Sequence, residues 1–190
     1  MTKNEMLIVL KIFKTPEKAF NSNSITKEIG ITPMGALKIM KRLEKDGILI
    51  SKAAGKAVFY GINNSEYARD YVKFVLKNEA AHSPPYTKRW LNEIRKLKSA
   101  DTAILFGSVL RKGKDANDID VLVITDQSRF EKLKEEVAEL NKINEKRMHV
   151  VYQIADDLQN NIAKGDKVVL NALKGIVAFG EERLIEAIII

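Results

Sequence analysis

Apolar residues in the first third of the chain recur at helical spacing and then at strand spacing. The spacing predicts three helices, over residues 4–14, 25–29 and 33–46, and then two strands, over residues 48–52 and 56–62. Ser24 precedes the second helix and Thr32 precedes the third, and both residue types cap helix N-termini. Gly55 lies in the turn between the two strands. We therefore expect three helices followed by a hairpin.

The middle of the chain, residues 64–99, has a helical pattern that Pro84 and Pro85 interrupt. Before this break, the spacing predicts an apolar helix face made of Tyr67, Tyr71, Phe74 and Val75. After it, a second face is made of Trp90, Leu91, Ile94 and Leu97. Aromatic residues at helical spacing indicate packing, between domains or across a dimer, rather than a platform for stacked bases.

Beyond residue 100, short apolar runs alternate with amphipathic segments. The runs predict strands over residues 103–106, 121–124, 147–152 and 175–180. The amphipathic segments predict helices over residues 128–145, 155–163 and 166–174 and from residue 181 onward. Ser128 is placed to cap the first of these helices. This order gives a small mixed sheet backed by helices, so the expected fold class is α+β.

Composition and charge restrict the functions that this fold can have. The 190 residues include no Cys, which excludes disulfides, cysteine-based zinc sites and thiol catalysis. No apolar run approaches the roughly 18 residues of a membrane span, and the start lacks a secretory signal, so we expect a cytoplasmic protein that does not contact a membrane. The net charge of +7 is divided as +6 in residues 1–63, +4 in residues 64–100 and −3 in residues 101–190. The basic half is expected to meet a polyanion.

The candidate chemistry lies between the first two strands beyond residue 100. Gly107-Ser108 follows the first strand, and Asp118-Ile119-Asp120 opens the second. Because side chains alternate along a strand, we expect both carboxylates on one face and Ile119 in the core. Two carboxylates repel each other unless a cation lies between them, and oxygen ligands suit Mg²⁺ that carries a nucleotide phosphate. Gly107 allows close approach of a ligand to the backbone, and Ser108 offers a hydroxyl and N–H groups to phosphate oxygens. The alternative is an ordinary hairpin whose loop holds Asp and Asn for turn geometry.

The Gly-Ser pair, an Arg three residues after the Ser, a Gly soon after the Arg, and the Asp-x-Asp that enters an apolar strand resemble a known signature. It is that of the minimal nucleotidyltransferases, small members of the polymerase-beta-type superfamily. The resemblance implies that Gly107, Ser108 and Arg111 hold the triphosphate of an NTP, with ATP expected. It also implies that Asp118 and Asp120 are the catalytic acids that hold Mg²⁺.

One position departs from this family. A third carboxylate usually lies on a later strand, where this chain has His149. A neutral imidazole could bind a metal or accept a proton, but it favours softer cations than Mg²⁺ and adds no negative charge. His149 is therefore either a metal ligand or an ordinary strand histidine with a hydrogen bond. Asp156 and Asp157 could replace the missing acid, or they could be the N-terminal acids of the next helix.

The helix, short helix, turn, helix and hairpin of residues 1–63 resemble the winged helix-turn-helix of archaeal and bacterial regulators. The resemblance implies that the third helix enters the major groove of double-stranded DNA and that the hairpin contacts the backbone. The residues expected at phosphates or base edges are Lys38, Lys41, Arg42, Lys52 and Lys56.

Base-specific hydrogen bonds are expected to be few, because Met34, Gly35 and Leu37 occupy the front of the third helix. The alternative to DNA binding is a winged helix used for dimerisation or protein contact.

These patterns predict three domains: a winged helix-turn-helix at residues 1–63, a helical connector for dimerisation at 64–100 and a nucleotidyltransferase-like domain at 101–190. Three functions agree with them. The first is an enzyme that transfers a nucleoside monophosphate from an NTP to a hydroxyl. The second is a transcriptional regulator whose C-terminal domain senses a nucleotide without turnover, and the third is an antitoxin-like partner of a toxin protein. The expected partners are double-stranded DNA, an NTP and a second copy of the chain.

Overall fold

The computed structural model describes residues 2–189 and divides the chain into two compact units. Unit 1 comprises the chain up to Val75 together with the residues from Ile188, and unit 2 runs from Leu76 to Ala187. The division falls within helix α4 (Glu66–Ala81), so the segment expected as a connector contributes to both units. No helix in this described part of the chain has the length and hydropathy of a membrane span.

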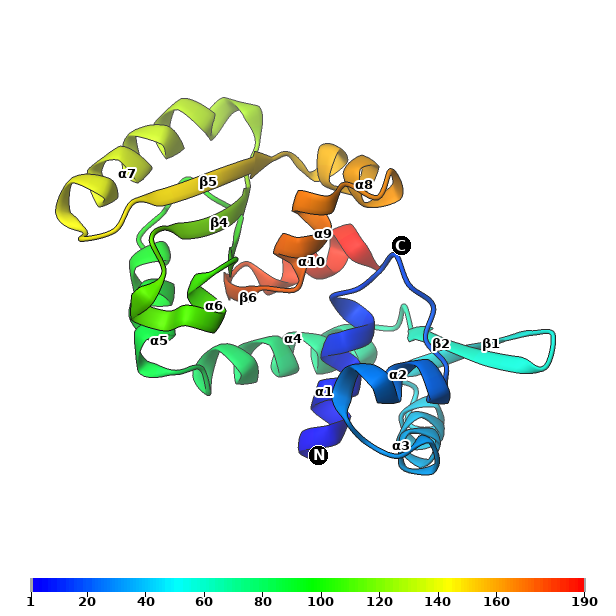
Figure 1. The fold of residues 1–190 in the computed structure, drawn as a ribbon. Helices are drawn as coiled ribbons and strands as arrows, with labels where there is room; N and C mark the ends of the chain where they lie inside the picture. Colours follow the sequence, from blue (N-terminus) through cyan, green and yellow to red (C-terminus); the bar gives the residue numbers. More distant parts are fainter. Residues whose placement is uncertain (1, 190) are drawn as a thin grey trace. The chain divides into compact units, whose positions relative to one another are not determined.

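Unit 1 is a winged helix-turn-helix (Figure 1). Its elements before α4 are α1 (Lys3–Phe13), α2 (Ser22–Ile29), α3 (Pro33–Lys45), β1 (Leu49–Ala54) and β2 (Ala57–Ile62). The strands β1 and β2 form an antiparallel hairpin, and α1, α2 and α3 contact one another. Tyr60 of β2 also donates its backbone N–H to the Phe20 carbonyl at 2.8 Å, which ties the hairpin to the segment before α2.

The second helix begins three residues earlier than predicted. Asn21, not Ser24, is its N-cap, and the Asn21 side chain accepts the backbone N–H groups of Asn23 and Ser24. Ser24 occupies the third helical position, and its hydroxyl accepts the Asn21 backbone N–H at 2.9 Å. The two side chains therefore satisfy each other's backbone donors as a capping box, which the prediction from Ser24 alone missed.

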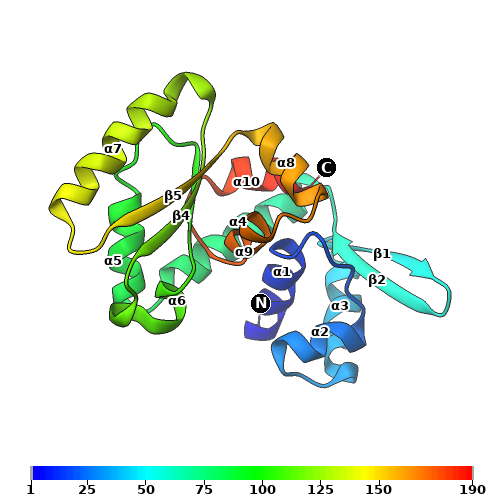
Figure 2. The ribbon, with the colours of Figure 1, turned by 45° about the horizontal axis from the view of Figure 1, so that its top comes forward.

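Unit 2 is built on a four-stranded mixed sheet with the strand order β5-β4-β3-β6. Figure 2 shows two of these strands, β4 and β5, side by side. The strands are β3 (Thr102–Phe106), β4 (Ile119–Ile124), β5 (Met148–Gln153) and β6 (Ile176–Phe179). Strand β3 pairs antiparallel with β4 and β6, whereas β5 pairs parallel with β4. The α-helices after α4 are α5 (Pro85–Ile94), α6 (Val109–Lys112), α7 (Phe130–Ile143), α8 (Ala155–Ala163), α9 (Lys167–Leu173) and α10 (Glu181–Ile188). The predicted α+β class is thus confirmed.

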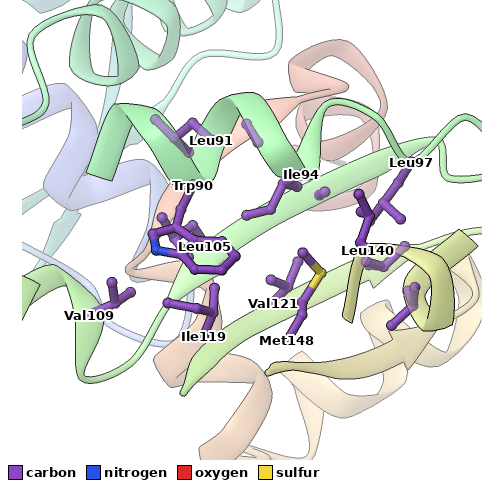
Figure 3. Packing of buried hydrophobic residues seen from close by; sticks show 14 of the residues in the cluster. Trp90, Leu91, Ile94, Leu97, Leu105, Val109, Ile119, Val121, Leu140 and Met148 are labelled. Atoms are coloured by element: carbon purple, nitrogen blue, oxygen red, sulfur yellow. The ribbon is translucent and has the colours of Figure 1, made fainter. Parts of the chain in front are cut away.

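The core of unit 2 lies between the sheet and the helices α5 and α7 (Figure 3). Trp90 and Ile94 of α5 pack over Leu105 of β3 and over Ile119 and Val121 of β4, and all five side chains are almost fully buried. The other face of β3 and β4 is contacted by α9. Strands β3 and β4 are therefore buried on both faces, and this packing fixes the positions of the residues at their ends.

The predicted apolar face of α4 is correct only in part. Val75 is buried as predicted and Tyr71 is half-buried, but Tyr67 and Phe74 are 62% and 53% exposed, and Ala68 and Val72 are buried in their place. Helical spacing allows either stripe, and the structure packs the stripe of smaller side chains inward. Helix α7 also differs, because it starts at Phe130 after a 3₁₀ turn that Asp126, not Ser128, caps.

Candidate functional site

The predicted site residues meet where β3 ends and where β4 and β5 begin, at one end of three neighbouring strands. Strand β3 ends at Phe106 directly before Gly107-Ser108, and Phe106 is paired with Asp120 near the start of the antiparallel strand β4. On the other side of β4, the parallel register places His149 beside Asp120. The glycine-serine corner, the Asp-x-Asp pair and the strand histidine therefore come together through the pairing of three strands.

Three candidate metal ligands lie within reach of a single ion. Asp118, Asp120 and His149 each offer one ligand atom, and these atoms all lie within 4.8 Å of one another. His149 Nδ1 lies 3.4 Å from Asp118 Oδ2, and the two side chains are 53% and 37% exposed. Ile119 between the two acids is fully buried. The alternation of β4 therefore turns both carboxylates to the face that carries His149 and turns Ile119 into the core.

Gly107 is required at this corner because Asp120 occupies the space of a side chain. Its φ is +80°, and a Cβ built there would lie 2.0 Å from Asp120 Oδ2. Burial raises the pKa of Asp120, and the nearby Asp118 carboxylate raises it further. His149 and the backbone N–H of Ser108 act in the opposite direction but do not compensate. The carboxylate is thus held in a position where its negative charge is not fully balanced by the protein.

This donor set fits a divalent cation. Ligand atoms bound to one ion at about 2.0–2.2 Å lie roughly 3.0–3.5 Å apart, so small side-chain rotations bring the three groups together. The raised pKa of Asp120 agrees with a site whose charge balance needs a cation. The exposed sides of Asp118 and His149 leave room for ligands that the protein does not supply.

The residues expected at the triphosphate lie on the loop after β3. Ser108 is half-buried at the N-terminus of the four-residue helix α6, and its side chain makes no capping hydrogen bond there. Arg111 in α6 is exposed, and its backbone N–H donates to the Ser108 carbonyl at 3.1 Å. The Ser108 hydroxyl and the Arg111 guanidinium are both on the segment that joins the glycine-serine corner to the acids.

Asp156 and Asp157 do not replace the third acid. They lie in the first turn of α8, after the end of β5, whereas His149 lies at the start of β5. Asp156 lines a separate hollow with Thr125 and Asp126, which follow the end of β4. The interpretation of Asp156 and Asp157 as the N-terminal acids of α8 is therefore confirmed.

Sequence reasoning missed Lys146. Its ammonium group donates to the carbonyls of Lys114 and Ala116, in the loop that leads to Asp118. Lys146 thus joins this loop to the segment that leads to His149. A lysine before a strand gives no sequence signal for such a contact, because the contact depends on which loops become neighbours.

A groove of about 850 Å³ also escaped prediction. It runs between α7 and the edge strand β5, and His149, Val150 and Tyr152 line it together with Asn141 and Lys134 of the helix. His149 lines this groove and also belongs to the acidic cluster, but neither Asp118 nor Asp120 lines the groove.

All five residues expected at DNA are exposed, namely Lys38, Lys41, Arg42, Lys52 and Lys56. Arg42 differs from the lysines because it forms an ion pair with Glu5 of α1, whose side chain is 7% exposed. Glu5 in turn accepts the backbone N–H of Thr2 as part of the α1 capping box. The Arg42 guanidinium therefore joins α3 to α1 inside unit 1.

At the front of α3, Met34 is 67% exposed, whereas Gly35 and Leu37 are half-buried. These three residues offer no side-chain hydrogen-bond donor for reading bases.

Unit 1 is a winged helix-turn-helix, and unit 2 is a nucleotidyltransferase-like domain with two acids at one edge of its mixed sheet. Residues 90–174, from within α5 to the end of α9, match the family model described as "Polymerase beta, Nucleotidyltransferase". This match contains the glycine-serine corner, both acids and His149.

Other comparisons add little. No curated protein matches the sequence. Two solved structures of Lactococcus lactis ZitR variants align with it at 20% and 13% identity, with TM-scores of 0.35 and 0.30. The alignments cover 51% and 50% of this chain and 60% and 70% of the ZitR chains. At these TM-scores the likeness carries no argument about fold or function.

Proposed function

We propose that this chain is a DNA-binding protein whose unit 2 binds a metal-NTP complex, with Mg²⁺ and ATP as the expected pair, and transfers a nucleoside monophosphate to a hydroxyl acceptor. The observation that supports it most directly is the convergence of Asp118 and Asp120 on the Gly107-Ser108 corner. The match of residues 90–174 to a nucleotidyltransferase family model gives independent support.

In this proposal the chain's residues position the reactants. Asp118 and Asp120 hold the cation, which neutralises charge that builds up on the phosphates. The Ser108 hydroxyl and the Arg111 guanidinium hold the triphosphate tail. The acceptor oxygen forms a bond to the α-phosphorus, the bond from the α-phosphorus to the bridging oxygen breaks, and pyrophosphate leaves. The acceptor proton passes to water.

A second candidate is a regulator that binds the nucleotide without turning it over. It is favoured by one specific observation, the presence of His149 where the family usually has a third acid. With two carboxylates in place of three, the site has less negative charge with which to activate a hydroxyl. Both candidates share the NTP site and differ in the chemistry that follows binding.

Isothermal titration calorimetry with Mg-ATP tests the shared part of the proposal. We expect wild-type protein to bind and the double variant D118N/D120N to lose at least tenfold in affinity, because the amides remove both negative charges. The matched control is D115N, since Asp115 is an exposed acid in the same loop but outside the ligand cluster. Equal affinity of the wild type and the double variant would remove the site.

Release of pyrophosphate separates the two candidates. A labelled product formed with wild-type protein and lost in D118N/D120N supports the transferase. Binding of Mg-ATP without release of pyrophosphate, across alcohol, nucleic-acid and protein acceptors, supports the sensor.

For both candidate functions, we expect the protein to form a homodimer in solution. Light scattering measures the mass of this dimer directly.

A further inference from the structure

His149 makes the candidate metal site chemically different from a site built of carboxylates alone. It lies beside Asp120 across the β4–β5 ladder, and its Nδ1 atom faces Asp118 Oδ2 at 3.4 Å. The cluster therefore offers one nitrogen and two oxygen donors within 4.8 Å. Among residues 2–189 no other group of three His, Cys, Asp or Glu side chains comes together in this way.

We propose that this centre takes a divalent first-row transition metal, such as Co²⁺ or Zn²⁺, in preference to Mg²⁺, with the His149 imidazole as the third ligand. This inference rests on the proposed NTP site and replaces Mg²⁺, the cation expected there from the family resemblance, with a transition metal. Mg²⁺ binds oxygen ligands, and negatively charged oxygens bind it most strongly. An imidazole in place of a carboxylate removes one oxygen ligand and one negative charge from the site. Imidazole nitrogen is a preferred ligand of first-row transition metals such as Zn²⁺, whereas carboxylate and water oxygens suit Mg²⁺ and Mn²⁺.

The geometry allows three ligands to bind together. Asp120 is fixed, because its carboxylate lies against Gly107 and the backbone N–H of Ser108 helps to hold it. Asp118 and His149 are more exposed, so their side chains have room to turn toward a cation at the fixed carboxylate. Bound ligands at about 2.0–2.2 Å need a separation of roughly 3.0–3.5 Å. The Asp118–His149 pair already meets this requirement at 3.4 Å.

Three protein ligands would leave positions open on the ion, as in catalytic rather than structural metal sites. Phosphate oxygens can occupy these positions, so a transition-metal ion is compatible with the proposed nucleotide site. Mg²⁺ is also commonly bound through only one or two carboxylates and keeps several waters, so the choice of metal depends on the chemistry of the donors and not on their number.

The test uses untagged full-length protein and the metal ions alone, without nucleotide. Calorimetry measures the affinities for Mg²⁺ and Co²⁺, and visible absorption of the Co²⁺ complex reports whether nitrogen is bound. We expect Co²⁺ to bind at least about tenfold more tightly than Mg²⁺. H149A should lose about 10–100-fold in Co²⁺ affinity and change the Co²⁺ spectrum, with a much smaller effect on Mg²⁺. H149D should lower the ratio of Co²⁺ to Mg²⁺ affinity, because it restores a carboxylate.

The second histidine of the chain provides the matched control. His82 is exposed near the end of α4, and its Nδ1 lies 2.8 Å from the Asn78 carbonyl, outside the cluster. H82A should therefore leave both affinities unchanged. Equal Co²⁺ affinity of H149A and the wild type, or an H149D variant with an unchanged ratio, would overturn the inference. Such a result with intact Mg-ATP binding refutes the metal preference alone, whereas loss of binding to every cation and to ATP refutes the proposed function as well.

Discussion

Gly107 and Asp120 depend on each other through one close contact. A methyl group at Gly107 would overlap the Asp120 carboxylate at 2.0 Å and would require an L residue at φ +80°. We predict that G107A displaces Asp120, costs about 1–3 kcal/mol of unfolding free energy, and lowers the affinity for Mg-ATP at least tenfold. Denaturant titration and calorimetry measure the two effects.

Gly165 separates backbone strain from the clash. It has a similar φ of +73° in the turn between α8 and α9, but a Cβ there would meet nothing within 4 Å. G165A should therefore cost a comparable amount of stability from the backbone alone and keep the affinity for Mg-ATP. If G107A also kept this affinity, the fixed position of Asp120 would have no role in binding.

Not every contact of the candidate site could be predicted from the sequence. The approach of the two acids to the glycine-serine corner could be, because strand alternation and motif order depend on neighbours in the chain, while the role of these residues stays a prediction. The partners of Arg42 and Lys146 could not, because Glu5 and the carbonyls of Lys114 and Ala116 become neighbours only through tertiary packing. Both cations looked free in the sequence, and each is used inside the fold.

At the scale of elements, Glu136 of α7 stabilises the connection between α5 and β3. Its carboxylate accepts the backbone N–H groups of Lys98 and Ser99 at 2.8 and 3.1 Å and the Ser99 hydroxyl at 2.7 Å. Burial alone would raise the pKa of Glu136, but these hydrogen bonds outweigh burial, so its pKa lies below the ordinary 4.5. The folded state therefore favours the ionised form.

This shift predicts a pH-dependent contribution to stability. A carboxylate whose folded pKa is depressed stabilises the fold above its unfolded pKa, and the effect is lost as pH falls through the folded pKa. We expect E136Q to lower the free energy of unfolding by about 1–3 kcal/mol at pH 7. The difference from the wild type should shrink as the pH falls below 4.5. Urea denaturation at a series of pH values measures it.

The neighbouring residue serves as the control for this prediction. Glu135 is exposed on the same helix, so E135Q should change stability little at any pH. A loss in E136Q that stays constant down to the acid limit would mean that packing, not charge, accounts for the effect.

Elements were predicted better than their ends and faces. The spacing of apolar residues was sufficient to predict the antiparallel β3–β4 hairpin and the core helices, because each of these elements buries the apolar side chains that define its spacing. The cap of α2 was wrong because Asn21 and Ser24 both can cap, and the choice depends on which backbone groups meet. The positions of Tyr67 and Phe74 on α4 were wrongly predicted as buried, because an aromatic stripe and a stripe of smaller residues compete for one buried face.

At the scale of the whole molecule, charge is divided between the two halves of the chain. Residues 1–63 hold 11 Lys and Arg against 5 Asp and Glu, whereas residues 101–190 hold 13 against 16. Exposed lysines on α3 and on the β1–β2 hairpin account for part of this basic charge. A polyanion should therefore bind unit 1, and the acidic half should be neutral or repulsive toward it.

Duplex DNA binding should depend steeply on salt, and the hairpin lysines should set part of that dependence. Each phosphate contact contributes about 0.9 to the slope of log K against log salt. We predict that K52Q/K56Q makes the slope shallower by about 1.8 and weakens binding to unrelated duplexes equally, because phosphate contacts carry no sequence information. The control is K164Q/K167Q, which removes the same charge from exposed positions of unit 2. Fluorescence anisotropy at several salt concentrations measures both slopes. Equal changes in the two variants would show that net charge, rather than contact by the hairpin, controls binding.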